Sequence, residues 1–137
     1  MKYDIVMFDL DGTILDTLED LTDSLNAVFK TKGYKERTIE EVRSFVGNGV
    51  FKLIERAVPV GTSHDDIYKT FMTFSEYYQK HCSIKTKPYE GIKEVIETLK
   101  NSGCMVVVIS NKIDEAVVSL CKQHFGSLID IAVGDKI

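Results

Sequence analysis

The stretch Ile5-Val6-Met7-Phe8-Asp9-Leu10-Asp11-Gly12-Thr13 decides the fold of this chain. Its first four residues form an apolar run that is too short for a helix and ends in residues typical of turns, so it predicts a buried strand. Asp9 and Asp11 follow the carboxyl end of that strand, where open α/β sheets bind ligands. Because an unpaired charge beside buried apolar residues is costly, we expect a cation or hydrogen bonds to meet Asp9.

A second apolar run, Met105–Ile109, is rich in β-branched residues and predicts a parallel strand buried on both faces. Ser110 and Asn111 follow it and precede a predicted helix, so the Ser110 hydroxyl and the N–H groups after it suit an anion. Alone, such a pair is more often a helix N-cap, but beside the two aspartates it favours a phosphate contact. A last strand is predicted over Leu128–Val133, ahead of Gly134-Asp135.

Residues 17–85 show helical spacing of apolar residues and no convincing strand. Turn and capping residues mark the helix ends: Gly33, Thr38 with Glu41, Gly47-Asn48-Gly49 and Ser63. This block is too long for a simple crossover between strands, so we interpret it as an inserted helical cap. The predicted domains are an α/β core of residues 1–16 and 86–137 and a helical cap of residues 17–85.

The composition is that of an ordinary globular domain. The 137 residues are 44% hydrophobic and 28% charged, with a net charge of −4, which favours neither nucleic acid nor a membrane as a partner. No apolar stretch has the length of a membrane span, and Asp4 and Asp9 interrupt any signal-peptide pattern. The three cysteines include no CxxC pair and the three histidines share no ligand spacing, so we expect reduced thiols and a cytoplasmic protein.

Two acids separated by one residue after a strand admit three interpretations. A calcium loop of the EF-hand type needs Gly and Glu where this chain has Ile14 and Asp20, so that interpretation fails. An Asx turn remains possible but would not require both acids. In the third interpretation one carboxylate attacks phosphorus and the other transfers protons.

Such chemistry brings two carboxylates to a phosphate dianion, so it needs a divalent cation, and oxygen ligands favour Mg²⁺. Gly12 would let the backbone approach the phosphate, and nearby N–H groups could bind its oxygens. We therefore place Gly12 and Thr13 among the candidate phosphate-binding residues.

At these residues the chain resembles the haloacid dehalogenase superfamily of phosphatases. DLDGT at 9–13 is similar to its first motif, and Ser110 after the apolar strand is similar to its second. Within the superfamily the chain resembles phosphoglycolate phosphatases, through VGNGV at 46–50, IERAV at 54–58, PYEGI at 88–92 and VVVISNK at 106–112. The resemblance implies a Rossmann-like α/β parallel-sheet core, here incomplete, with an inserted helical cap, and a small phosphorylated metabolite as substrate.

The resemblance also implies roles for single residues. Asp9 would be the nucleophile and Asp11 the general acid/base, with Ser110 and Asn111 at the phosphate. The Asp9 carboxylate and the Asp11 carbonyl would bind Mg²⁺. An acid at Asp11 separates the chain from the superfamily's dehalogenases and transport ATPases. The loop containing Asn48 is either a turn between cap helices or a cap loop that closes over the substrate, and we include Asn48 as a candidate phosphate ligand.

The superfamily's third motif, a lysine that steadies the phosphate, and its later metal-binding acids are expected beyond Gly134-Asp135. Lys87-Pro88 precedes the second motif, which excludes it as the third, and Lys136 is too close to the preceding strand. Asp135 belongs to the turn before the third motif on this interpretation. We therefore expect the N-terminal part of a longer phosphatase, with little or no turnover by residues 1–137 alone, and self-association through an exposed Tyr3–Phe8 edge.

Two alternatives share these features. A β-phosphoglucomutase-like phosphotransferase would return the phosphate to a sugar rather than to water. A non-catalytic phosphate-binding or interaction protein would use the same strand ends without chemistry.

Overall fold

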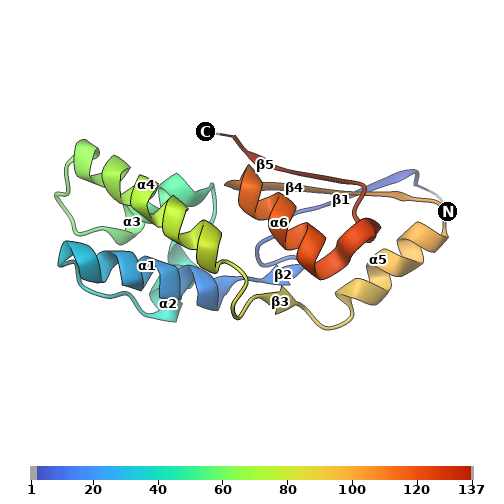
Figure 1. The fold of residues 1–137 in the computed structure, drawn as a ribbon, viewed down its shortest axis with the longest axis horizontal. Coiled ribbons are helices and arrows are strands. Elements are labelled where there is room, and N and C mark those ends of the chain that lie inside the picture. Colours follow the sequence, from blue (N-terminus) through green and yellow to red (C-terminus); the bar gives the residue numbers. More distant parts are fainter. Residues whose placement is uncertain (1–2, 137) are drawn as a thin grey trace. The chain divides into compact units, whose positions relative to one another are not determined.

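The structure, a computed structural model, describes residues 3–136. The chain divides before Thr17 and after Thr86 into two compact units, one α/β and one helical (Figure 1). From the sequence, the end of the helical unit is predicted after residue 85, one residue earlier. Each unit is described in turn.

The α/β unit contains a three-stranded parallel sheet in the order β1-β4-β5. Its strands are β1 (Ile5–Phe8), β4 (Met105–Ile113) and β5 (Ile131–Asp135), joined through α5 (Ile92–Asn101) and α6 (Asp114–Phe125). A short antiparallel pair, β2 (Leu15–Asp16) and β3 (Lys87–Pro88), stands apart from it. Both crossovers between parallel strands run in the same direction, so right-handed connections put α5 and α6 on one side of the sheet (Figure 1). The predicted parallel α/β core is confirmed.

The sheet is buried on one face and largely exposed on the other, where Val107 is an exception, so the prediction of a strand buried on both faces is wrong. Val106 and Val108 are completely buried, whereas Ile5 is 49% and Met7 64% exposed. Further exposed apolar residues alternate along the neighbouring strands: Met105, Ile109, Ile131 and Val133. Because α5 and α6 both cover one face, the apolar side chains of the other face remain accessible in the described part of the chain.

The predicted ends of the last two strands are also wrong. β4 continues past Ile109 to Ile113, and its pairing with β5 is irregular between these two residues. β5 begins at Ile131 because the preceding Gly126–Leu128 segment forms a 3₁₀ turn. Gly134-Asp135 therefore lies inside a strand rather than in a turn. Gly134 is required there by close packing, since a Cβ atom would collide with the Lys112 carbonyl oxygen.

The helical unit consists of α1 (Leu18–Lys32), α2 (Ile39–Phe45), α3 (Val50–Ala57) and α4 (His64–His81). The predicted helix ends are confirmed: Gly33 adopts a left-handed C-cap, Thr38 and Glu41 form a capping box, and Ser63 caps α4. The core includes Phe29, Ile54, Phe74 and Tyr78, all fully buried. None of the helices in residues 3–136 has the length and apolar character needed to cross a membrane.

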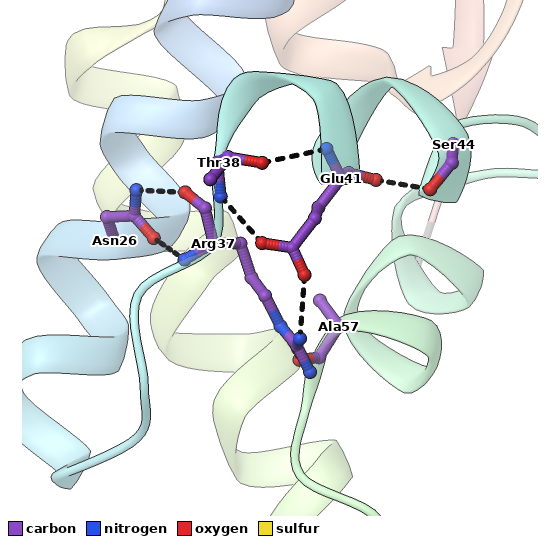
Figure 2. Close-up of polar contacts among 6 residues, drawn as sticks. All are labelled: Asn26, Arg37, Thr38, Glu41, Ser44 and Ala57. Atoms are coloured by element: carbon purple, nitrogen blue, oxygen red, sulfur yellow. Dashed lines mark hydrogen bonds and ion pairs between the residues drawn. The ribbon is translucent and has the colours of Figure 1, made fainter.

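Arg37 joins three helices of this unit (Figure 2). The Asn26 side chain donates to the Arg37 carbonyl and accepts from the Arg37 N–H, both at 2.8 Å, which connects α1 to the start of α2. The guanidinium donates to the Ala57 carbonyl at 2.9 Å and to Glu41 at 3.0 Å. The Thr38 backbone N–H and then Arg37 lower the pKa of Glu41 by favouring its charged form.

Asp20 connects the beginning and the end of the helical unit by hydrogen bonds. Its carboxylate is 2% exposed and accepts hydrogen bonds from the Lys85 N–H, the Thr86 N–H and the Thr86 hydroxyl. The first helix of the unit is thereby connected to the segment that leaves it. The sequence alone points to Asp20 only as a position in a calcium loop and gives no sign of this contact.

Candidate active site

Asp9 lies directly after β1, and its side chain is exposed. One carboxylate oxygen, Oδ1, accepts the Leu10 N–H at 2.8 Å. The hydrogen bond from Leu10 agrees with the expectation that a cation or hydrogen bonds meet Asp9, although Asp9 is exposed because β1 itself is half exposed. The exposed carboxylate can be reached by a solute, as a nucleophile requires.

The turn after Asp9 is closed by its own backbone. The Thr13, Ile14 and Leu15 N–H groups all donate to the Leu10 carbonyl, and the Gly12 N–H donates to the Leu15 carbonyl at 3.0 Å. Gly12 has φ +74°, a conformation that favours glycine. Because the Gly12 and Thr13 N–H groups serve the turn, phosphate binding by these two residues stays a prediction.

Ser110 lies at the same edge of the sheet as the two aspartates, since Phe8 pairs in parallel register with Val108. The Ser110 hydroxyl oxygen accepts the Lys112 N–H at 3.1 Å. α6 begins at Asp114 with Ile113 as its N-cap, so Ser110 precedes the helix as predicted but does not cap it. Asn111 is exposed within the irregular part of β4. The Ser110 hydroxyl hydrogen is thus one donor that this strand end can offer to an anion.

Lys112 is the residue that sequence reasoning missed. It is 2% exposed, yet its ammonium Nζ lies 3.2 Å from Asp11 Oδ1. The Asp11 side chain is 31% exposed, so the pair joins the interior of the unit to its surface. A signal was present: Val108, Ser110 and Lys112 alternate along one strand and share its buried face. The strand predicted from the sequence ends at Ile109, so Lys112 falls outside it, and the lysine that the resemblance implies is expected beyond Gly134-Asp135.

The oxygen donors at this edge fit Mg²⁺. Among residues 3–136, no group of three or more His, Cys, Asp or Glu side chains is placed to hold a metal ion. Mg²⁺ is commonly held by one or two carboxylates with waters and substrate phosphate completing its shell. Asp9 and Asp11 supply such a partial set of hard oxygen ligands.

Asn48 belongs to the helical unit, where it adopts φ +67°. Arg56 holds its loop by donating to the Phe45 carbonyl, the Gly47 carbonyl and Asn48 Oδ1, at 2.9 to 3.2 Å. The loop therefore has a defined structure between α2 and α3, as a turn would. A contact between Asn48 and phosphate stays a prediction.

The cysteines of the described residues are poorly placed to act as nucleophiles. Cys82, Cys104 and Cys121 are free and buried, in agreement with the prediction of reduced thiols. Burial raises the pKa of the Cys121 thiol to about 11, so this thiol is protonated at neutral pH and a poor nucleophile.

Comparison with known proteins places this geometry in a family. The model of the family described as "Haloacid dehalogenase-like hydrolase" matches residues 6–136. The phosphoglycolate phosphatase of Neisseria gonorrhoeae is 33% identical over 122 residues, which cover 86% of this chain and 52% of that protein. The N-acetylmuramic acid 6-phosphate phosphatase of Pseudomonas aeruginosa is 29% identical, covering 82% of this chain and 50% of that protein.

A solved structure is similar over nearly the whole chain. The crystal structure of a candidate phosphoglycolate phosphatase from Lactobacillus delbrueckii subsp. bulgaricus superposes with a TM-score of 0.90 at 34% identity. The match covers 99% of this chain and 66% of that one. The chain spans about half the length of the curated relatives named above.

Proposed function

Because the chain belongs to the haloacid dehalogenase-like hydrolase family, we propose that its α/β unit carries part of the active site of a magnesium-dependent phosphomonoester hydrolase of the phosphoglycolate phosphatase type. The observation that supports this most is the meeting of Asp9, Asp11 and Ser110 at the carboxyl edge of one parallel sheet. Asp9 is exposed there, and the Asp11 carboxylate is accessible and paired with a cation.

The reaction proceeds in two steps. The Asp9 oxygen that does not accept the Leu10 N–H attacks phosphorus, and the bond between phosphorus and the leaving oxygen breaks. Protonated Asp11 gives its proton to that oxygen, so the alcohol departs neutral. Asp11 then takes a proton from a water molecule as the water oxygen attacks the phosphorus of the Asp9 acyl phosphate, and the bond between phosphorus and the Asp9 oxygen breaks. Inorganic phosphate is released, and both side chains return to their starting states.

Other atoms of this edge meet the charge of the phosphate. The Ser110 hydroxyl accepts the Lys112 N–H, which leaves its hydrogen to donate to a phosphate oxygen. The Asp9 carboxylate and the Asp11 carbonyl would hold Mg²⁺, which when bound offsets the repulsion between the carboxylates and the phosphate. Asn48 and its loop are proposed as the part of the helical unit, acting as a cap, that contacts the substrate.

The proposed substrate is a small phosphorylated metabolite, with phosphoglycolate first because the N. gonorrhoeae relative carries that name. The P. aeruginosa relative, named for a phosphorylated sugar acid, keeps the choice of metabolite open. Because the chain spans about half of these relatives, activity is proposed for the whole protein. For residues 1–137 alone we expect binding with little or no turnover.

The test uses the ¹⁵N-labelled chain of residues 1–137 with Mg²⁺ and beryllium fluoride, an analogue of an aspartyl phosphate. Amide signals of Gly12, Ser110 and their neighbours are expected to shift only when both components are present, and the shifts are expected to vanish in Asp9→Asn. Asp16→Asn, a change to an exposed aspartate of the same unit, is the control and should keep them. Equal shifts in both variants, or none in the wild type, would refute the proposal. A parallel assay with p-nitrophenyl phosphate measures turnover. Robust hydrolysis would overturn the expectation that residues 1–137 alone show little or no turnover.

A further inference from the structure

Lys112 places a buried positive charge beside the proposed acid/base. The residue is 2% exposed, and its ammonium lies 3.2 Å from Asp11 Oδ1. Burying an ammonium group is costly unless a partner of opposite charge meets it. Asp11 is such a partner, and it is accessible from outside because its side chain is 31% exposed. The buried cation therefore holds one end of a carboxylate whose other end can meet solutes.

The backbone on both sides of this pair is fixed by hydrogen bonds and packing. On the β4 side, the Lys112 N–H donates to the Ser110 hydroxyl oxygen. The Lys112 carbonyl packs against Gly134, whose N–H donates to Asp114 Oδ1 at 2.8 Å. On the β1 side, Asp11 forms an isolated bridge with Leu15 in the closed turn. Neither side chain therefore depends on a mobile backbone to reach the other.

We propose that Lys112 is a positioning residue that holds the Asp11 carboxylate in one orientation for proton transfer. A general acid must lie within hydrogen-bond reach of the oxygen it serves, and a free aspartate rotates among several rotamers. A fixed ammonium selects the rotamer that it contacts, which gives Asp11 a constant direction. After Asp11 has given its proton to the leaving oxygen, the ammonium also offsets the negative charge that Asp11 then carries near Asp9. The catalytic meaning rests on the proposed function, whereas the orientation of Asp11 can be measured without it.

The first test measures the χ1 torsion of Asp11 in solution from three-bond couplings to its carboxylate carbon. In the wild-type chain the couplings are expected to report one rotamer. In Lys112→Met, which keeps the apolar stem and removes the charge, they are expected to average over several. Lys112→Arg should restore most of the preference, and Lys122→Met, a change to an exposed lysine of α6, should leave it intact. A single Asp11 rotamer in folded Lys112→Met would overturn the proposal.

A second measurement does not depend on the stability of Lys112→Met. The Lys112 ammonium of the wild-type chain is expected to exchange its protons slowly and to show a hydrogen-bond coupling to the Asp11 carboxylate carbon. In Asp11→Asn the exchange should accelerate at least tenfold. An ordered Lys112 without the coupling would also overturn the proposal.

The two proposals fail in different ways. If Asp9→Asn leaves the beryllium fluoride shifts unchanged, the proposed function is wrong, whatever the Asp11 rotamer shows. If the shifts depend on Asp9 while Asp11 keeps one rotamer in Lys112→Met, the proposed positioning role of Lys112 is wrong and the proposed function is unaffected. In any turnover that the wild-type chain shows, Lys112→Met should lower kcat more than tenfold and leave KM within twofold, because Asp11 is proposed to transfer protons rather than to hold the phosphate group.

Discussion

Within residues 3–136, each unit buries one charged side chain almost completely, and the two side chains differ in what surrounds them. In the helical unit, the Asp20 carboxylate accepts hydrogen bonds from Lys85 and Thr86. In the α/β unit, the Lys112 ammonium pairs with Asp11, whose side chain reaches the surface. Asp20 is thus enclosed together with the backbone groups it binds, whereas the enclosed Lys112 binds a carboxylate that reaches the surface.

This difference separates a charge that maintains a fold from one that is suited to chemistry. A carboxylate satisfied by backbone donors has no remaining capacity for a solute and contributes to closure of the chain. A buried ammonium paired with an accessible carboxylate orients a group that can still exchange protons with a ligand. Burial of a charge alone therefore does not indicate function, and the exposure of its partner is the useful observation.

The largest effect is expected from Asp20→Ala. This change removes the acceptor of two backbone N–H groups and the Thr86 hydroxyl, leaving buried donors unsatisfied. We expect the free energy of unfolding to fall by about 3 kcal/mol, measured by urea denaturation. Hydrogen exchange should show faster opening of the helical unit, where Asp20 lies.

Asp23→Ala is the matched control. Asp23 lies one turn further along α1 and forms an exposed ion pair with the Lys85 side chain at 2.7 Å. Exposed pairs contribute little to stability, so this variant should unfold close to the wild type. Equal losses in the free energy of unfolding in the two variants would mean that the hydrogen bonds to buried Asp20 do not hold the helical unit together.

The next largest effect is expected on self-association, which we propose to occur through the exposed face and edge of the sheet. Met7 is 64% exposed on β1, which pairs with β4 on one side within the described residues. A lysine at an edge strand opposes pairing with another chain, so Met7→Lys should weaken association at least severalfold without unfolding the unit. Sedimentation velocity over a range of concentrations measures this.

Met72→Lys tests the same substitution at an exposed methionine of the helical unit. It should leave association unchanged, because helices present no unpaired strand edge. A wild-type chain that stays a monodisperse monomer at all concentrations would contradict the proposed association altogether.

The helical unit was predicted well because its signals are local. The capping box of Thr38 and Glu41 and the C-cap Gly33 each depend on neighbours within a few residues. The apolar positions of each helix recur with a period that indicates which side is buried. Sequence reasoning missed the hydrogen bonds of Asp20 in this unit, because they join residues that lie 65 and 66 positions apart in the chain.

In the α/β unit, the sequence indicated the strands and Asp9, Asp11 and Ser110, but not their surroundings. An apolar strand can be covered on one face or on both, and its composition does not distinguish these cases, so the exposure of Ile5 and Met7 was missed. The register of β5 depends on the 3₁₀ turn before it and on the close packing of Gly134. Lys112 was missed because its role depends on a strand end that continues past Ile109.

The smallest effect is expected from Asp130→Asn. Asp130 lies in the α/β unit and, like Asp20, accepts hydrogen bonds through its carboxylate, but it is partly exposed. Hydrogen bonds from the Lys100 ammonium and then from the Val106 N–H, both at 2.7 Å, lower the pKa of Asp130. The stabilisation is therefore complete above the unfolded pKa of about 3.9 and is lost as the pH falls through the lower folded value. The wild type should be more stable than Asp130→Asn at pH 7, by less than the loss in Asp20→Ala. Urea denaturation at pH 7 and at decreasing pH below 4 should show the difference shrinking. A constant difference would mean that Asp130 acts through packing rather than through its charge.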